Sequence, residues 1–346
     1  MLDESTLTRI LDALPRLSMA LVGDLFLDRY LDLDASLTET SVETGLDAYQ
    51  IVRVRCYPGA GGTVLNNLHA LGFGKLHAVS VIGSDGEGFE LLRALRDRRV
   101  ETTGVVVRSD RMTPTYTKPM LSQATGPARE LNRLDIKNRS AASADQDREV
   151  IAQLDALAAS VDAVIVADQV TERNQGVVTD AVREHVALLA SRHPKCVFLA
   201  DSRRHICLFR NCITKPNRRE LLEAMPGAVG AKSENSTHAD VRIAASALSR
   251  RTSRPVYATV GPDGIVYVGG DTWQHIPGIR ADGPIDIVGA GDSTTAGIVS
   301  ALCAGATPAQ AARLGCLVAS ITIQQLGVTG TATPAQVLQR FRECLR

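Results

Sequence analysis

Short apolar runs alternate with amphipathic segments along most of this chain. The runs at 20–22, 79–82, 163–166, 197–200 and 257–260 have the length of buried strands. Helical spacing of apolar positions lies between several of them, at 88–97, 147–158, 177–191 and 237–249. Further helices are predicted at 4–14 and in the last part, 292–343. This alternation is typical of a parallel sheet covered on both faces, with ligands beyond the carboxyl ends of its strands.

Two regions depart from that alternation. Val52, Val54 and Cys56 alternate with two arginines, and 104–108, 115–121 and 130–136 also have strand character without intervening helices. We predict a small antiparallel sheet here, a lid contributed by about 32–57 and 104–136 of a single domain, 1–346. A half-covered sheet leaves an apolar face that suits a substrate or a second subunit.

Composition excludes several classes of partner. Among 346 residues, Lys and Arg number 38, as do Asp and Glu, and aromatic residues make up 4%. Bulk charge and base stacking therefore give no reason to expect nucleic acid or a membrane as partner. The seven cysteines and seven histidines lack metal-ligand spacing, and the first residues are acidic where a signal peptide would be basic. A reduced, cytoplasmic setting is the expectation.

The most informative stretch is Asp-Ile-Val-Gly-Ala-Gly-Asp at 286–292, directly before an apolar helical segment. Free backbone amides at a helix start attract anions, and glycine lets the backbone approach them closely. A carboxylate in the same turn would repel an anion unless it has its own task, such as taking a proton from an attacking hydroxyl. Phosphoryl transfer fits this arrangement, and an ordinary glycine turn capped by aspartate is the alternative.

Two further motifs follow the same logic. Asn217-x-x-Glu220 opens a helix after the strand at 212–214, where both side chains could orient a hydrated Mg²⁺ and nucleotide phosphates, or form a capping box. Thr259-x-Gly261-x-x-Gly264 joins two strands, which is also all that a hairpin turn needs.

Carboxylates and glycines near the first strand could serve a polyol. Asp24 and Asp28 follow the strand at 20–22, and carboxylates at a strand end can accept hydrogen bonds from hydroxyls. A glycine-rich segment then leads into a helix that ends near Leu71 and Gly72. A solvated charge at Asp28 and a plain glycine-rich helix entry are the alternatives.

In this order, the motifs resemble those of the ribokinase/PfkB family of carbohydrate kinases over about 18–343, and most nearly its heptose-phosphate kinase branch. The resemblance implies a ribokinase-like three-layer α/β/α fold with a mainly parallel sheet and a small β-sheet lid. It implies an ATP-dependent kinase that uses Mg²⁺, acts on a sugar or sugar phosphate and forms a homodimer through the lid.

Residue roles are carried over from the matching motifs. The resemblance makes Asp292 the base, with Gly289, Ala290 and Gly291 as the anion hole and Asp286 as a ligand for a monovalent cation such as K⁺. It assigns Mg²⁺, through water, to Glu220 and Asn217, and assigns nucleotide contacts to these and to Lys215, Thr259, Gly261 and Gly264. Sugar contacts fall to Asp24, Asp28, Gly61, Gly62, Thr63, Asn66 and Asp168, and a phosphate on the substrate to Lys118 and Arg133.

This chain departs from the family pattern at three places. Ile287 replaces the usual threonine, and Ser202 and Arg203 follow Asp201 where Pro and Lys or Arg are usual. The family has two glycines and then, after three residues, an asparagine that contacts the sugar. Gly61 and Gly62 with Asn66 fit that spacing, yet counting back from Leu71-Gly72 puts Thr63 in the asparagine's place and Ala60 where the second glycine belongs. A catalytically silent sugar- or nucleotide-binding homologue and a nucleoside kinase remain alternatives.

Overall fold

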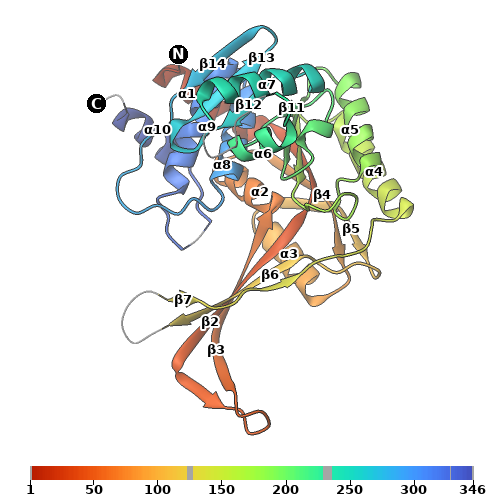
Figure 1. The fold of residues 1–346 in the computed structure, drawn as a ribbon, viewed down its shortest axis with the longest axis vertical. Coiled ribbons are helices and arrows are strands. Elements are labelled where there is room, and N and C mark those ends of the chain that lie inside the picture. The colour runs from red at the N-terminus through yellow and green to blue at the C-terminus, as the bar shows by residue number, and fades with distance from the viewer. Residues whose placement is uncertain (1, 123–127, 229–235, 328, 345–346) are drawn as a thin grey trace.

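The computed structural model describes residues 2–122, 128–228, 236–327 and 329–344, and it contains a large sheet between two layers of helices (Figure 1). The strands follow the order β14-β13-β12-β11-β10-β9-β1-β4-β5. All neighbours pair in parallel except β12 with β13 and β13 with β14. Their bounds are β1 Ser18–Gly23, β4 Lys75–Gly83, β5 Val100–Arg108, β9 Ala163–Asp168, β10 Val197–Ser202, β11 Ile213–Thr214, β12 Val256–Thr259, β13 Ile265–Gly269 and β14 Thr272–Ile276.

Helices cover both faces of this sheet because its central strands are apolar on both sides. On β1, Met19 and Leu21 pack into one buried cluster and Ala20 and Val22 into another. The first cluster includes α1 Glu4–Ala13, α2 Gly61–Ala70, α3 Gly86–Arg96, α8 Ala290–Cys303, α9 Pro308–Thr322 and α10 Pro334–Glu343. The second includes α4 Ala144–Ala158, α5 Asp180–Arg192, α6 Arg218–Ala224 and α7 His238–Thr252. The three-layer α/β/α fold predicted from the sequence is confirmed.

A second sheet projects from the main body as a long, narrow lid (Figure 1). Its five strands are β2 Leu25–Thr40, β3 Asp47–Ala60, β6 Thr115–Ser122, β7 Arg129–Glu130 and β8 Leu134–Ile136. The β2–β3 hairpin is antiparallel, but β2 and β6 run parallel, so the expectation of a wholly antiparallel lid was wrong. β2 leaves the body directly after β1, which places its first residues at the carboxyl edge of the main sheet.

The lid boundaries also differ from the prediction. Residues 104–108 belong to β5, which pairs in parallel with β4 at the edge of the main sheet. The segment was misassigned because no helical pattern separates it from the strand at 115–121, with which it was grouped. At the other end, the lid begins at Leu25 and not near 32.

No helix in the described ranges is long and apolar enough to cross a membrane.

Candidate active site at the start of helix α8

The glycine turn at 289–291 begins α8 at the carboxyl edge of the main sheet. Gly289 is the N-cap, with φ of 80°, and a Cβ there would lie 2.7 Å from Thr329 Cγ2 and 3.3 Å from Thr63 Cγ2. Three segments distant in sequence therefore meet at one glycine. The Ala290 N–H donates to the Ile287 carbonyl at 3.1 Å, so it is already engaged. Within the described chain, the Gly289 and Gly291 amides have no such partner and remain available to an anion.

Asp292 lies in the first turn of α8, half-buried, with its carboxyl group deep among protein atoms. Burial raises the pKa of Asp292 to about 7, and the nearby Asp201 carboxylate adds to the rise. The Lys215 ammonium and the Arg203 guanidinium oppose it. A carboxyl group with a pKa near neutrality is well matched to accepting a proton at physiological pH.

A buried ion pair lies beside Asp292. Lys215 Nζ is 2.9 Å from Asp201 Oδ2, and both residues are more than nine-tenths buried. Thr295 Oγ1 on α8 also donates to Asp201 at 3.2 Å, which ties the pair to the same helix as Asp292. The Lys215 ammonium lies 3.7 Å from where a Gly291 Cβ would be. Lys215, predicted to contact nucleotide, is thus at the anion-binding turn itself.

The Asn217 and Glu220 side chains form a capping box at the start of α6. Asn217 Oδ1 accepts from the Glu220 N–H at 2.9 Å, and Glu220 Oε2 accepts from the Asn217 N–H at 2.8 Å. The structural alternative from the sequence is therefore realised. The capping box uses only one carboxylate oxygen of Glu220. The other, Oε1, has no hydrogen bond in the part of the chain that the structure covers. Burial raises the pKa of Glu220, and Asp201 contributes to the rise.

The loop that joins β12 to β13 lies against this capping box. Thr259 forms a bridge with Asn217, and its N–H donates to the Pro216 carbonyl at 2.9 Å. Gly264 has φ of 99° and lies so close to the Ile276 carbonyl that no side chain fits. Gly261, with φ of 66°, has open space where its Cβ would be. The two motifs predicted to share a nucleotide are adjacent.

The entrance to α2 explains the unusual glycine segment. Ala60 is the N-cap and has φ of 53° and ψ of −122°, a conformation suited to glycine. Its geometry agrees with the register that places Ala60 at the family's second glycine and Thr63 at its asparagine. Gly61 and Gly62 are packed against Leu21 and Pro58, which leaves no room for side chains. Asn66 lines a cavity of about 220 Å³ together with Tyr57, His69 and Arg98.

The two carboxylates after β1 have different surroundings. Both oxygens of Asp24 accept backbone hydrogen bonds, from the N–H groups of Gln169, Val170 and Val177 at 2.8–2.9 Å. Asp24 thus anchors the loop after β9, and each of its oxygens accepts at least one backbone hydrogen bond. Asp28 lies 3.5 Å from Lys118 Nζ, with no backbone partner in the described chain, and an added Cβ at Gly59 would lie 2.7 Å from Asp28 Oδ2. Of these two carboxylates, Asp28 is the more exposed, at 15% of its side chain against 3% for Asp24 as a whole residue.

The two lid cations already have partners. Lys118 is held by Asp28 and by the Tyr30 hydroxyl, 3.1 Å away. Arg133 forms a two-pronged pair with Asp135 at 2.6 and 2.8 Å, and its guanidinium lies over the Tyr116 ring. Both cations predicted as phosphate ligands are therefore ion-paired within the lid in this structure.

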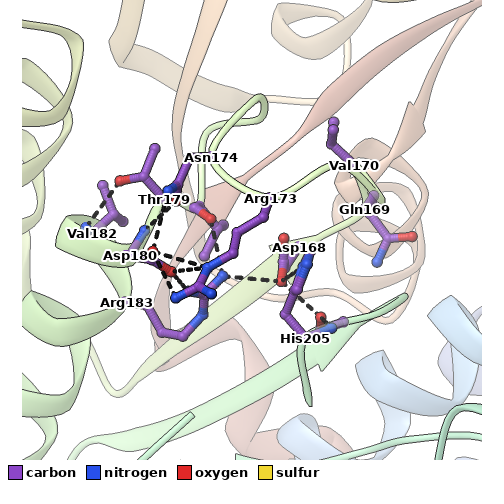
Figure 2. Close-up of polar contacts among 12 residues, drawn as sticks. Asp168, Gln169, Val170, Arg173, Asn174, Thr179, Asp180, Val182, Arg183 and His205 are labelled. Carbon is purple, nitrogen blue, oxygen red and sulfur yellow. Dashed lines mark hydrogen bonds and ion pairs between the residues drawn. The ribbon is translucent and has the colours of Figure 1, made fainter. Parts of the chain in front are cut away.

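Asp168 belongs to a buried polar cluster (Figure 2). It accepts from Ser202 Oγ at 2.7 Å, and the Arg183 guanidinium and the His205 ring lie 3.6 Å from the same oxygen. Figure 2 shows Gln169, the next residue, apart from this cluster. Asp168 is buried to 3% exposure, so its contacts here are with protein.

Asp286 accepts from the Val288 N–H at 3.0 Å, and its own N–H donates to the Ile323 carbonyl.

Sequence reasoning missed the importance of Asp201 and of Arg203. The sequence motifs assign no role to Asp201, because the residues after it differ from the family pattern. The sequence feature that could have pointed to Asp201 is Lys215, directly before Pro-Asn. Its side chain is the buried cation next to Asp201. Arg203 gave no signal in sequence, and the fold brings its charge within electrostatic range of Asp292.

Comparison with known proteins gives a consistent result. The family described as "pfkB family carbohydrate kinase" matches residues 30–336. A bifunctional protein HldE of Gluconacetobacter diazotrophicus is 30% identical over 92% of the chain, and one of Trichlorobacter lovleyi is 28% identical over 97%. The chain spans 62% and 65% of the lengths of these two relatives.

Solved structures agree on the fold. Arabidopsis thaliana ribokinase, complexed with ribose and ATP, has a TM-score of 0.68 at 17% identity and is covered over 99% of its length by 94% of this chain. Phosphofructokinase-2 from Escherichia coli, in complex with potassium, has a TM-score of 0.69 at 17% identity; the match covers all of it and 95% of this chain.

Proposed function

Because the chain belongs to the pfkB family of carbohydrate kinases, we propose that it transfers the γ-phosphate of ATP to a hydroxyl of a sugar or sugar phosphate, as heptose-phosphate kinases do. The observation that carries this proposal is Asp292, a carboxylate with a pKa near 7 in the first turn of α8, beside unengaged backbone amides. A base and an anion site within one helical turn are what transfer of a phosphoryl group to an alcohol requires.

Asp292 takes the proton of the acceptor hydroxyl as its oxygen attacks the γ-phosphorus. The Gly289 and Gly291 amides then donate to the charge that develops on the transferred group, each contributing on the order of 3 kcal/mol. Lys215, which keeps Asp201 neutralised beside this turn, adds positive charge where the phosphoryl group passes. The Ala290 amide, engaged with Ile287, contributes through the shape of the turn.

The nucleotide lies along the Thr259–Gly264 loop and the start of α6. Among the described residues none donates a hydrogen bond to Glu220 Oε1, so this carboxylate oxygen is available for a magnesium-bound water, and Asn217 fixes its position through the capping box. Glu220 and Asn217 would hold Mg²⁺ through water, and the ion would supply positive charge against the nucleotide phosphates. Asp286 is the proposed ligand for a monovalent cation.

The acceptor is held between the lid and α2, in our proposal by Asp28 and the first turn of α2 near Thr63. The lid also provides the proposed homodimer contact. Ile51, Val52 and Val54 on β3 are each about half-exposed, and Ile51 and Val54 pair with Leu33 and Leu31 across the hairpin. A row of exposed apolar side chains on a projecting hairpin favours burial against a second copy.

The test is ADP release with MgATP over neutral sugars, sugar phosphates including heptose 7-phosphate, and nucleosides. We expect turnover of a sugar or sugar phosphate and a fall of about 100-fold or more in kcat for Asp292→Asn. Asp282→Asn, an exposed acid of the same segment, is the matched control and should keep full activity. Magnesium and potassium titrations of Glu220→Gln and Asp286→Asn test the two cation assignments.

Three other outcomes would change the conclusion. Turnover of nucleosides alone would favour a nucleoside kinase. Binding of ATP or sugar without turnover of any acceptor would favour a silent homologue. Unchanged kcat in Asp292→Asn would remove Asp292 as the base.

A further inference from the structure

The turn after β10 brings an arginine, Arg203, to the carboxyl edge of the main sheet. Its N–H donates to the Asp168 carbonyl at 3.0 Å, which extends the pairing of β10 with β9 by one more bond. Ser202 fixes the same turn, because its hydroxyl donates to Asp168 Oδ2 at 2.7 Å and accepts from the His205 N–H at 2.9 Å. The backbone that carries Arg203 is therefore held on both sides.

The direction of the Arg203 side chain follows from the strand before it. Side chains two residues apart on a strand point to the same face of the sheet. Leu199 packs into the buried cluster that includes α8, and Asp201 continues that face by accepting from Thr295 of α8. Arg203 is the next residue in this series. Thr295 is three residues after Asp292 and shares its helical face, so Arg203 lies on the side of the sheet where the proposed transfer occurs.

The Arg203 guanidinium acts on groups that surround the proposed transfer path. Burial raises the pKa of Asp292 on α8, of Glu220 on α6 and of Tyr116 on β6, and the charge of Arg203 opposes the rise in each pKa. In our proposal the γ-phosphate lies between Asp292 and Glu220. A cation that acts on both carboxyl groups and on the lid is therefore close to the space for that phosphate.

The guanidinium has hydrogen-bond donors to spare. Arg203 is exposed, and its Nε donates to Gln169 Oε1 at 2.8 Å. Its two terminal nitrogens have no hydrogen bond or ion pair to any residue that the structure describes. By contrast, Lys215, Lys118 and Arg133 are each paired with a carboxylate. Two parallel bonds from a guanidinium to phosphate oxygens are stronger than one bond to a neutral amide oxygen, so a phosphoryl group would attract this side chain.

We propose that Arg203 is a catalytic residue that binds the γ-phosphoryl group as it moves from ATP to the acceptor. The inference rests on the kinase function proposed above and adds a residue to it. In this step the acceptor oxygen forms a bond to the γ-phosphorus and its proton passes to Asp292. The bond from the γ-phosphorus to the bridging oxygen breaks, and its electron pair leaves with ADP. The terminal nitrogens of Arg203 donate to the oxygens of the transferred group, where charge gathers in the transition state.

Binding of a mimic of the transferred group tests this contact without an acceptor. Calorimetry gives the Kd of MgADP with aluminium fluoride, which imitates the planar phosphoryl group, for the wild type and for Arg203→Ala. We expect at least tenfold weaker binding of the mimic to Arg203→Ala. MgADP alone should bind equally to both chains, which also shows that the variant is folded. Arg204 is exposed and pairs with Glu223, so Arg204→Ala is the matched control and should bind the mimic as the wild type does.

Kinetics then measure the contribution to turnover. The kcat values are compared on the high-pH plateau of each variant, where a change in the ionisation of Asp292 does not contribute. We expect kcat to fall at least 100-fold in Arg203→Ala, with a much smaller change in KM for ATP, because the contact forms with the transferred group. Arg203→Lys keeps the charge without the planar fork and should recover part of the loss. Guanidinium ion added to Arg203→Ala at tens of millimolar should also raise kcat.

Two results would overturn the proposal. One is an equal Kd for the mimic in the wild type and Arg203→Ala. The other is an unchanged plateau with a displaced acidic limb, because Arg203 would then act on Asp292 through its charge alone. Failure of the kinase function is a separate result. If the wild type turns over no acceptor but Arg203→Ala still weakens binding of the mimic, the phosphoryl contact stands and the sugar kinase assignment is removed.

Discussion

Replacing Lys215 with methionine is expected to raise the pH at which the enzyme becomes active. Lys215 is 3% exposed, and its ammonium lowers the pKa of Asp292 against burial and the charge of Asp201. An opposite charge within about 4–6 Å typically shifts a carboxyl pKa by 1–3 units. A base must be deprotonated to act, so a higher pKa moves the acidic limb of the rate profile to higher pH.

The expected size follows from the wild-type value. With a pKa of about 7, roughly half of Asp292 is ionised at pH 7. A rise of one unit in this pKa leaves roughly a tenth of Asp292 ionised at pH 7. The kcat measured at pH 7 should therefore fall about fivefold more than the kcat measured at high pH. Any direct contact of Lys215 with the phosphoryl group would lower the plateau but would not move the limb.

Asp201 provides the matched counter-variant. Asp201→Asn removes the like charge that helps to raise the pKa of Asp292, so the acidic limb should move to lower pH. Lys215→Met alone leaves Asp201 buried and unpaired, at a cost of about 3–5 kcal/mol in unfolding free energy, which the double variant relieves. Steady-state kcat from pH 5.5 to 9.5, with thermal melting of each variant, measures both effects. A limb that stays in place in Lys215→Met would refute the electrostatic argument.

Two further predictions address stability and assembly. Ala60→Gly should stabilise the chain by about 1 kcal/mol, because glycine adopts the observed φ of 53° and ψ of −122° without strain. The gain should appear as a higher midpoint of unfolding in urea. The control Ala70→Gly, at the end of α2, should lower that midpoint instead. Ile51→Asp/Val54→Asp should convert the proposed lid dimer to a monomer, as measured by light scattering. The control Thr38→Asp should remain a dimer. A wild-type chain that is monomeric at tens of micromolar would contradict the dimer.

The agreement between sequence and structure is closest where local pattern alone decides the outcome. Apolar runs such as 163–166 became central parallel strands, and Thr307 and Thr333 cap two of the helices expected within 292–343. The same reasoning failed for 104–108, because the lack of a helix between two strands does not show that they belong to the same sheet.

The sequence by itself determined the three-layer fold, the family and the position of the glycine turn before α8, because periodicity and short-range motifs are local properties of the chain. Tertiary structure alone decided how charges are shared: Asp24 with three backbone amides, Lys215 with Asp201, and Arg133 with Asp135. These partners are set by which strand ends meet at the edge of the sheet. Whether a carboxylate or a cation remains free for a ligand depends on its neighbours in space, and spacing along the chain does not specify them.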